Sequence, residues 1–417
     1  MTNQVKTAIL HYSASPVIGG VEGVIQAHCQ VLLQHGYPVS VIAGRGDQKS
    51  LPEGTIFHHV PELDSQHPEV LKISAALEDG HVPQNFDSFT QQITKKLSQI
   101  LISYDNLIVH NVFTKHFNIP LSAAMNQLLD LEEIHNCIAW CHDFTWTSLN
   151  SRSKVHEGYP WDLLRKYDSR VTYVSVSKER QKTLANLYNQ PDENIQVVYN
   201  GVDPQVLLGL SEEGYRLIQK LDILDSDLIL LMPLRVTQAK NIEYALHLLK
   251  NLKERGTRTK LIHTGPPDPH SESSMAYYHS LQKLRRDLDL ENDMHFIFES
   301  GKHPNTPNEI SLDIVGELYR VSDVMLMPSH REGFGMPVLE AGLVGIPAIC
   351  TFAVPAAVEI GGEDVTVFKV SDDYENLGST LLEWTKTNPQ YRFKRRIRQK
   401  FTWDAIFRQD ILPLLSK

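Results

Sequence analysis

The chain has 417 residues, which is too many for one hydrophobic core of ordinary size, so two domains are expected. Hydrophobic residues make up 41% and charged residues 22%, and no run approaches the roughly 18 continuous apolar residues of a membrane span. The net charge of -10 argues against a nucleic-acid binder, which normally carries an excess of Lys and Arg.

The start of the chain carries one lysine and a short apolar run over residues 1–16. This pattern is typical of a first strand and lacks the features of a signal peptide. We therefore expect a cytoplasmic protein that makes no stable insertion into a membrane.

Strand-like runs alternate with helical patterns through the first half, which is typical of parallel α/β architecture. The stretch 44–84 is irregular and polar, and is expected to be a loop-rich insertion. A helix is predicted over 21–35, and the predicted strands are 7–12, 38–44, 106–110, 135–142, 171–177 and 195–201.

The alternation breaks near residues 200–213 and then restarts, so the predicted domains are 1–204 and 205–400, followed by a last segment, 401–417. Two doubly wound halves imply a cleft between the carboxyl edges of two parallel sheets, with functional residues at strand ends. The strands predicted for the second half are 228–234, 259–265, 294–300, 324–328 and 347–350.

Two glutamates flank a glycine-rich bend in SHREGFGMPVLEAG, residues 329–342. Pro337 suits the first position of a short helix over 337–343, whose unpaired N–H groups offer a seat for an anion. Glu340, one turn into this helix, can accept hydrogen bonds from two neighbouring hydroxyls, as on a ribose. The alternative is that Glu332 and Glu340 are surface residues on a flexible turn.

Arg235 and Lys240 lie on one loop between the predicted strand 228–234 and a helix that begins near Asn241. A lysine at a helix start faces the positive end of the helix dipole, so a negative ligand would offset the cost. Two cations beside helix N–H groups match the charge of a diphosphate. The alternative is two solvated surface cations.

Three motifs in the first half also fall at strand ends. Gly19 and Gly20 allow close approach of the backbone to a ligand, but they do not form GxGxxG, which argues against a nicotinamide dehydrogenase. His142, beside Asp143, could donate a hydrogen bond to a substrate or be a half-buried histidine paired with its neighbour. Asn200 begins an Asn-Gly turn that suits a hinge.

Two further clusters have a structural explanation. Cys137, Cys141 and His142 are close in sequence, yet they end a buried strand and no second ligand pair follows, so no metal site is expected. The basic run 393–400 is expected to be a solvated helix face, with contact to an anionic membrane surface as the alternative.

Taken in order, the motifs resemble the retaining glycosyltransferases of family 4, which have the GT-B fold. The resemblance spans residues 19–359, and its most specific part is 316–349. The motifs that carry it are GGVE at 19–22, HD at 142–143, NGVD at 200–203, Arg-x4-Lys-Asn at 235–241 and Glu-x7-Glu at 332–340.

The resemblance implies that the second half holds a nucleoside diphosphate sugar. Arg235 and Lys240 would clamp the diphosphate and stabilise the leaving group in place of a metal, and Glu340 would bind the ribose. Glu332 would hold hydroxyls of the transferred sugar, and His142 would lie near that sugar or the acceptor. The implied catalytic set is His142, Arg235, Lys240 and Glu332.

The implied donor-binding set contains glycines and loop residues besides these charged groups. Phe298 or its neighbours would contact the nucleobase, although the loop 299–310 is longer than the usual pattern. The stretch after residue 401 would cross back to pack on the first half. The full implied set is Gly19, Gly20, Asn200, Arg235, Lys240, Gly265, Phe298, Glu332, Gly333, Phe334, Gly335, Met336, Val338, Leu339 and Glu340.

The activity implied is metal-independent transfer, with retained configuration, of a hexose from a UDP- or GDP-linked sugar to a hydroxyl acceptor. No cofactor is needed besides this donor substrate. A small soluble acceptor or glycan is expected from the acidic composition, and a lipid-linked acceptor remains open. Two other functions also remain open: a nucleotide-sugar 2-epimerase of the same fold, and a catalytically silent nucleotide-sugar-binding protein.

Overall fold

The computed structural model describes residues 5–268, 270–301, 310–369, 371 and 373–415. The chain divides into two compact units, Met1–Gly201 with Trp403–Lys417, and Val202–Thr402. The division falls just before the predicted 204/205 boundary because Val202 forms a short parallel bridge with Thr402, and its N–H donates to the carbonyl of Phe401 at 2.8 Å. Each unit is described by itself.

A seven-stranded sheet forms the centre of the described first unit, in the order β3-β2-β1-β4-β5-β6-β7. Every neighbouring pair is parallel, as the alternation of strand and helix predicts. The strands are β1 (Thr7–Ser13), β2 (Val39–Arg45), β3 (Ile56–His59), β4 (Asn106–His110), β5 (Asn136–Cys141), β6 (Val171–Ser175) and β7 (Ile195–Val197).

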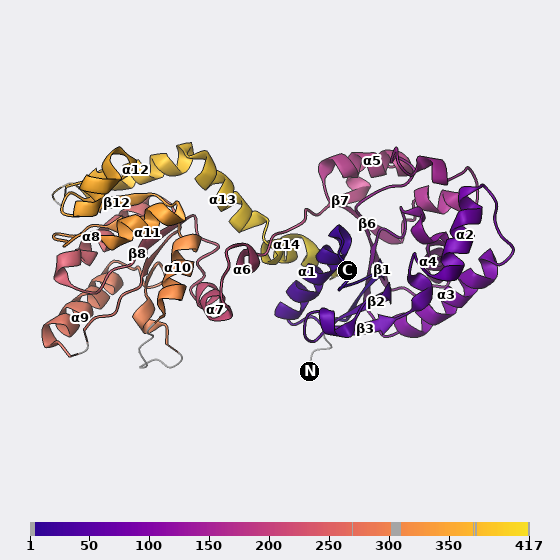
Figure 1. The fold of residues 1–417 in the computed structure, drawn as a ribbon, viewed down its shortest axis with the longest axis horizontal. Coiled ribbons are helices and arrows are strands. Elements are labelled where there is room, and N and C mark those ends of the chain that lie inside the picture. The colour runs from indigo at the N-terminus through magenta and orange to yellow at the C-terminus, as the bar shows by residue number, and fades with distance from the viewer. Residues whose placement is uncertain (1–4, 269, 302–309, 370, 372, 416–417) are drawn as a thin grey trace. The chain divides into compact units, whose positions relative to one another are not determined.

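Helices cover both faces of this sheet, because alternate strand residues point to opposite sides. In β1, Ile9 packs on one face with α1 (Gly20–Gln34) and the chain end, whereas Leu10 packs on the other face. Figure 1 shows α1 and α14 opposite α3 and α4. The remaining helices of the unit are α2 (Pro68–Glu78), α3 (Phe86–Leu101), α4 (Ile119–Asp130), α5 (Lys178–Tyr188), α14 (Trp403–Ile406) and α15 (Leu412–Leu415).

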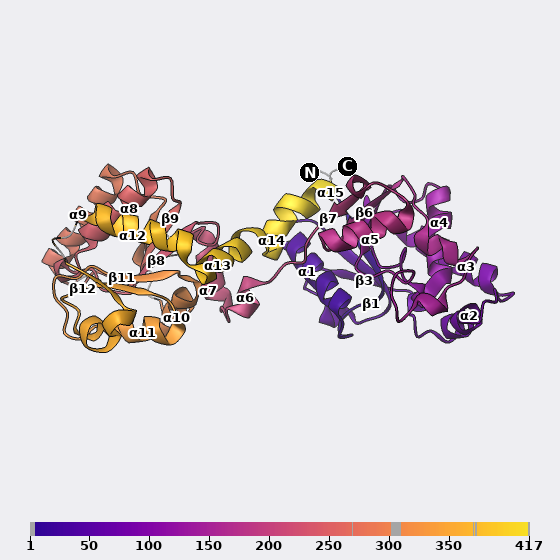
Figure 2. The same ribbon diagram turned by 90° about the horizontal axis from the view of Figure 1, so that it is seen from above.

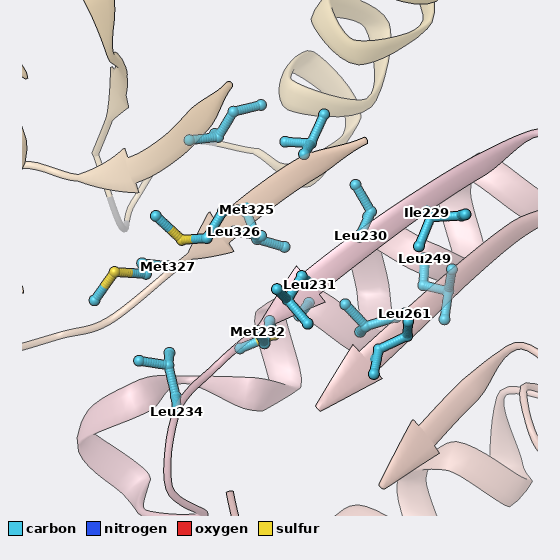
Figure 3. Packing of buried hydrophobic residues seen from close by; sticks show 14 of the residues in the cluster. Ile229, Leu230, Leu231, Met232, Leu234, Leu249, Leu261, Met325, Leu326 and Met327 are labelled. Carbon is cyan, nitrogen blue, oxygen red and sulfur yellow. The ribbon is translucent and has the colours of Figure 1, made fainter. Parts of the chain in front are cut away.

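The described second unit has a six-stranded parallel sheet in the order β10-β9-β8-β11-β12-β13. Its central strands are buried on both faces, so their sequences are continuously apolar (Figure 3). The strands are β8 (Leu228–Met232), β9 (Thr259–His263), β10 (Met294–Phe296), β11 (Val324–Met327), β12 (Ala348–Thr351) and β13 (Thr366–Phe368).

Figure 2 shows α8, α9 and α12 on one face of the second sheet and α10 and α11 on the other. This two-faced covering is the doubly wound arrangement, which leaves the carboxyl ends of the strands free for a ligand. The helices of this unit are α6 (Pro204–Leu207), α7 (Glu212–Lys220), α8 (Ile242–Glu254), α9 (Glu272–Asp287), α10 (Leu312–Val321), α11 (Met336–Val344), α12 (Tyr374–Thr387) and α13 (Pro389–Lys400).

The sequence-based prediction was wrong about several local elements. The stretch 44–84 contains the short strand β3 and the helix α2, whose buried residues Val70, Ile73 and Leu77 have a helical spacing that the prediction overlooked. The predicted strand 294–300 ends at Phe296 and continues as a 3-10 turn, Ile297–Glu299. Most of the long loop 299–310 lies outside the described residues.

The basic run 393–400 forms most of α13, and three of its cations are not merely solvated. Arg398 is buried and contacts the fully buried carboxylate of Asp323 at 3.0 Å. Arg395 pairs with Asp227 at 2.5 Å, and Lys394 donates to the carbonyl of Ser322 at 2.7 Å. These bonds attach α13 to the second unit.

No helix in the described part of the chain is long and apolar enough to cross a membrane.

Candidate functional site

The loops after β8 and β11 meet where the strand order of the second sheet reverses. β9 lies on one side of β8 and β11 on the other, with Val324 opposite Leu230 and Met325 opposite Leu231. Ligands of doubly wound sheets bind outside the carboxyl ends of the strands at this switch point. Lys240 follows β8 and Glu332 follows β11, so the topology brings both predicted residues to this place.

Hydrogen bonds join the two loops. The N–H of His330 donates to the carbonyl of Ala239 at 2.8 Å, and the side-chain amide of Asn241 donates to the carbonyl of Pro328 at 3.1 Å. Asn241 has a φ of +51°, in the left-handed region that asparagine tolerates better than most residues. These contacts hold the start of α8 beside the bend that follows β11.

Lys240 and Glu332 form an ion pair across the two loops. Nζ of Lys240 lies 2.5 Å from Oε1 of Glu332, and the side chains are only 19% and 10% exposed. Ser329, which is buried, also donates to Oε1, at 2.8 Å. Burial, aided by the charge of Glu332, raises the pKa of the nearby Cys350 thiol to about 12. The pair is therefore an enclosed charged group, not a solvated surface contact.

Arg235 occupies the same loop as Lys240, but its side chain is exposed and forms no ion pair with the described residues. Its backbone is placed by Gly265, which follows β9. A Cβ at Gly265 would lie 2.1 Å from the carbonyl oxygen of Leu234 and 2.8 Å from Cα of Arg235. Only glycine permits this approach, so Gly265 packs against the cation-bearing loop.

The bend after β11 leads into α11 through Gly335, which has a φ of +104°. A Cβ at this position would meet Cγ1 of Val354 at 2.5 Å. No side chain caps the start of α11, and Pro337 occupies its first turn as predicted. Pro337 has no N–H, and the N–H of Val338 donates to the carbonyl of Gly335 at 3.0 Å. In the first turn of this nine-residue helix, the N–H of Met336 is therefore the group left for an anion.

Glu340 is exposed on α11, and one of its carboxylate oxygens accepts a hydrogen bond from the neighbouring helix α10. The hydroxyl of Tyr319, on α10, donates to Oε2 of Glu340 at 2.6 Å. Burial, followed by this contact, raises the pKa of Tyr319, so the hydroxyl keeps its proton and remains a donor. The other carboxylate oxygen of Glu340 has no protein partner among the described residues and can accept a hydrogen bond from a hydroxyl group of a ligand.

The remaining predicted residues of the second unit lie on the bend before α11, on α11 itself and, in the case of Phe298, just after β10. Phe334 and Met336 are 39% and 55% exposed, Val338 is buried, and Gly333 and Leu339 lie beside them on the bend and on α11. Phe298 is half-buried and contacts the ring of Tyr278 edge-on, with centroids 5.7 Å apart.

The predicted residues of the first unit lie at the carboxyl edge of its own sheet. Gly19 and Gly20 are exposed at the start of α1, and nothing lies within 4 Å of a Cβ placed on Gly20. Asn200 is exposed just after β7, next to Gly201, whose missing side chain makes room for Trp403.

His142 is mostly buried after β5, and burial lowers its pKa to about 4. Nε2 of His142 lies 3.0 Å from Nδ1 of His110, and its backbone N–H donates to Oδ1 of Asn111 at 2.8 Å. The neighbouring Asp143 instead pairs with Arg180 at 3.3 Å. The expected histidine-carboxylate neighbour is thus replaced by a histidine pair.

Two groups of side chains that follow or end β5 belong to the core of the first unit. Cys137 and Cys141 are buried free thiols, and the described residues contain no group of three or more ligand side chains placed to hold a metal. The aromatic side chains of Phe144, Trp146 and Trp161 are buried as well.

Three site residues were missed: Ser329, Tyr319 and His110. Ser329 stands three residues before Glu332, where a loop hydroxyl is an ordinary feature, and Tyr319 lies on a helix with no local signal. His110 could have been found, because it ends a strand next to the one that precedes His142.

Two family models match the chain, "Glycosyltransferase Family 4" over residues 18–206 and "Glycosyl transferases group 1" over 216–400. An uncharacterized glycosyltransferase of Methanocaldococcus jannaschii is 26% identical over 60% of this chain, and the match spans 61% of that protein. Mannosylglucosylglycerate synthase of Thermotoga maritima is 21% identical over 81% of this chain and 78% of that protein. The crystal structure of Anabaena Alr3699/HepE in complex with UDP is 17% identical over 99% of this chain and 100% of that chain, with a TM-score of 0.35.

Proposed function

This chain belongs to the group 1 glycosyltransferases of family 4, and from that membership we propose that it transfers a hexose from a UDP- or GDP-linked sugar to a hydroxyl acceptor. The observation that carries the proposal is the enclosed Lys240–Glu332 ion pair at the switch point of the second sheet. The pair supports the proposal because it brings a lysine together with the carboxylate that we assign to the transferred sugar, four residues before the start of α11.

The groups of the second unit divide the donor among them. Lys240, Arg235 and the N–H of Met336 at the start of α11 receive the diphosphate, because fixed donors stabilise the charge that develops on the leaving group. Glu340, steadied by Tyr319, accepts hydroxyls of the ribose. Glu332 accepts hydroxyls of the transferred sugar once the diphosphate competes for Lys240.

We propose that transfer proceeds with retention and without a metal. The bond between the anomeric carbon and the diphosphate oxygen breaks, and the acceptor oxygen bonds to the same face of that carbon. The acceptor proton passes to the departing diphosphate. Two cations and a helix dipole supply the positive charge for this step, which is the basis for expecting metal independence.

The acceptor in our proposal is a small molecule or glycan. The name of the Thermotoga relative describes a product that contains mannose, glucose and glycerate units, which supports an acceptor of this size. Gly20 and His142 of the first unit would contact the donor phosphates and the transferred sugar or acceptor.

Nucleotide binding tests the proposal first. At millimolar concentration UDP or GDP should raise the melting temperature, since a ligand at about 100 times its Kd stabilises the folded state by roughly 2.7 kcal/mol. The matching monophosphate, UMP or GMP, is the control and should act more weakly because it lacks the second phosphate. The absence of a shift with every nucleoside diphosphate would remove the proposal.

Product analysis separates the remaining alternatives. Donor hydrolysis or transfer that releases nucleoside diphosphate and persists in excess EDTA supports a metal-independent transferase. An epimerised nucleotide sugar would instead identify a 2-epimerase, and nucleotide binding without any turnover would identify a silent binding protein.

A further inference from the structure

A cluster of four histidines lies in the first unit, around the place where its strand order reverses. His11 lies on β1, His28 on α1, His110 at the end of β4 and His142 just after β5. The ring of His110 is 5.4 Å from each of the rings of His142 and His28, measured between centroids. The proposed function uses only His142, so the role of His110 needs an explanation.

The rings of His110 and His142 are joined by a single N–H···N hydrogen bond. Nδ1 of His110 lies 3.0 Å from Nε2 of His142, within hydrogen-bond distance. Burial lowers the pKa of His142 to about 4 and that of His110 well below its usual range, so both rings are neutral at pH 7. A bond between two neutral imidazoles has one donor and one acceptor, and the donor determines the tautomer of both rings.

The surroundings of His110 decide which ring donates. Its Nε2 is buried without a partner among the described residues, and so is the indole N–H of Trp140, whose ring lies 6.0 Å away. If His110 accepted at Nδ1, its own proton would sit on Nε2 as a second buried N–H without an acceptor. A buried N–H without a partner is rarer and costlier than an unused lone pair. His110 therefore carries its proton on Nδ1 and donates.

The backbone holds this pair in register. Nδ1 of His11 donates to the carbonyl oxygen of His110 at 2.9 Å, since a carbonyl can only accept. On the other side, Oδ1 of Asn111 accepts from the backbone N–H of His142 at 2.8 Å. Asn111 has a φ of +62°, so the turn between the two strand ends is itself specified. Both rings are thus fixed relative to each other.

We infer that His110 is a positioning residue that holds His142 in the Nδ1–H tautomer, so that His142 presents an N–H donor to its ligand. Nδ1 of His142 has no hydrogen-bond partner in the described chain. It is also not one of the fully buried polar atoms of the described residues, so a ligand can reach it. That this ligand is the transferred sugar or the acceptor rests on the proposed function. The tautomer itself does not.

The donating tautomer limits what His142 can do. A neutral ring that carries its proton on Nδ1 donates to a hydroxyl oxygen and cannot remove a proton through that same atom. Its other nitrogen is already occupied by His110. His142 consequently orients or polarises a hydroxyl group of its ligand. The proton of the acceptor hydroxyl is transferred to the departing diphosphate.

Nitrogen NMR tests the tautomer directly. In the full-length chain labelled with 15N-histidine at pH 7, long-range 1H–15N spectra should show a protonated Nδ1 and an unprotonated Nε2 for His142. The His142 signals are assigned by their loss in His142→Asn. The opposite pattern, or a charged ring, overturns the inference. This measurement needs no substrate, so it stands apart from any failure of the proposed transferase activity.

Variants of His110 test its positioning role. His110→Phe keeps a flat ring but removes the donor, so the His142 signals should move toward averaged tautomer values. Donor hydrolysis should fall roughly tenfold in kcat, the effect of losing one orienting hydrogen bond, with little change in KM. His110→Asn, whose amide nitrogen can donate from the Nδ1 position, should restore both readouts.

His295→Phe, at a mostly buried histidine of β10, is the matched control and should leave the His142 signals unchanged. Unchanged His142 signals in a folded His110→Phe chain would overturn the positioning role. If His110→Phe does not fold, the wild-type spectrum and His110→Asn still decide the question.

Discussion

At the scale of single residues, the Lys240–Glu332 pair is the feature that links structure to chemistry. The two side chains come from loops that are 92 positions apart in sequence, and Ser329 orients the shared carboxylate. Within a largely enclosed site, a charged group that loses its partner is left with an uncompensated desolvation cost. In the proposed function, a diphosphate that draws Lys240 away would free Glu332 for sugar hydroxyls, so the pair would couple binding of the diphosphate to binding of the sugar.

Replacing Lys240 tests this assignment. Lys240→Ala should lower kcat about 10²- to 10³-fold, as expected for the loss of a group that stabilises the leaving charge. The measurement is donor turnover with circular dichroism to confirm folding. Lys250→Ala is the control, because Lys250 makes only a one-turn helix pair with Glu254 at 3.6 Å. Near wild-type turnover of folded Lys240→Ala would show that the cation has another role.

The glycine before α11 gives a second prediction for single residues. Gly335→Ala places a Cβ at a φ of +104° and against Val354, so the free energy of unfolding should fall by about 1–3 kcal/mol. Gly342→Ala, inside α11 with nothing within 4 Å, should raise it by up to about 1 kcal/mol. Urea unfolding of the two variants measures both effects. The same sign for both would contradict the conformational argument.

At the scale of elements, α13 has a polar sequence but stabilises the second unit through buried ionic contacts. Its composition suggests a solvated helix, yet Arg398 reaches the buried Asp323, and Lys394 and Arg395 bond to the same unit. Asp323 ends the connection into β11, and its Oδ2 also accepts from the N–H of Ile229 on β8 at 3.0 Å. The helix therefore supports the two strands whose loops form the site.

Removing Arg398 should destabilise the second unit strongly. Arg398→Ala leaves the buried carboxylate of Asp323 with Lys394, at 3.5 Å, as its remaining cation among the described residues, and breaking a buried pair costs about 3–5 kcal/mol. Arg392→Ala, at an exposed position of the same helix, should change stability by less than about 0.5 kcal/mol. Denaturant titrations compare the two. Equal effects would mean that the buried pair contributes no more than an exposed arginine.

At the scale of the whole molecule, several of the predicted site residues of each unit lie where the strand order of that unit reverses. In the first unit this point lies between β1 and β4, near Gly19 and the histidine cluster; in the second it lies between β8 and β11. The common cause is that parallel strands direct all their carboxyl ends to one edge. In the first unit this place holds the largely buried histidine cluster, and in the second it holds the Lys240–Glu332 ion pair.

Buried histidines make stability depend on pH throughout the molecule. Burial lowers the pKa of His116, His142, His263 and His295 to about 4 and that of His28 to about 3. In the unfolded chain these histidines have a pKa near 6.5, so below that pH they bind protons that the folded chain does not bind. Stability should therefore be complete above about pH 6.5 and fall as the pH drops toward 4. Urea unfolding at several pH values tests this, and a flat profile between pH 7.5 and 5 would contradict it.

Much of the fold could be predicted because its signals are local. The apolar runs of β8 and β11, Pro337 at the start of α11 and Gly345 at its end each act within a few residues of where they stand. Short elements with weak periodicity, such as β3 and β13, could not be found this way. Their existence depends on the strands beside them, with which they share backbone hydrogen bonds.

The sequence by itself determined two runs of alternating strands and helices and the polar residues that follow the strands, because each pattern is written in neighbouring residues. Only the tertiary structure decided that Lys240 meets Glu332, that Tyr319 holds Glu340 and that His110 pairs with His142. Such partners lie 21 to 92 positions apart. Strand order brings them together, and strand order depends on how the whole chain packs.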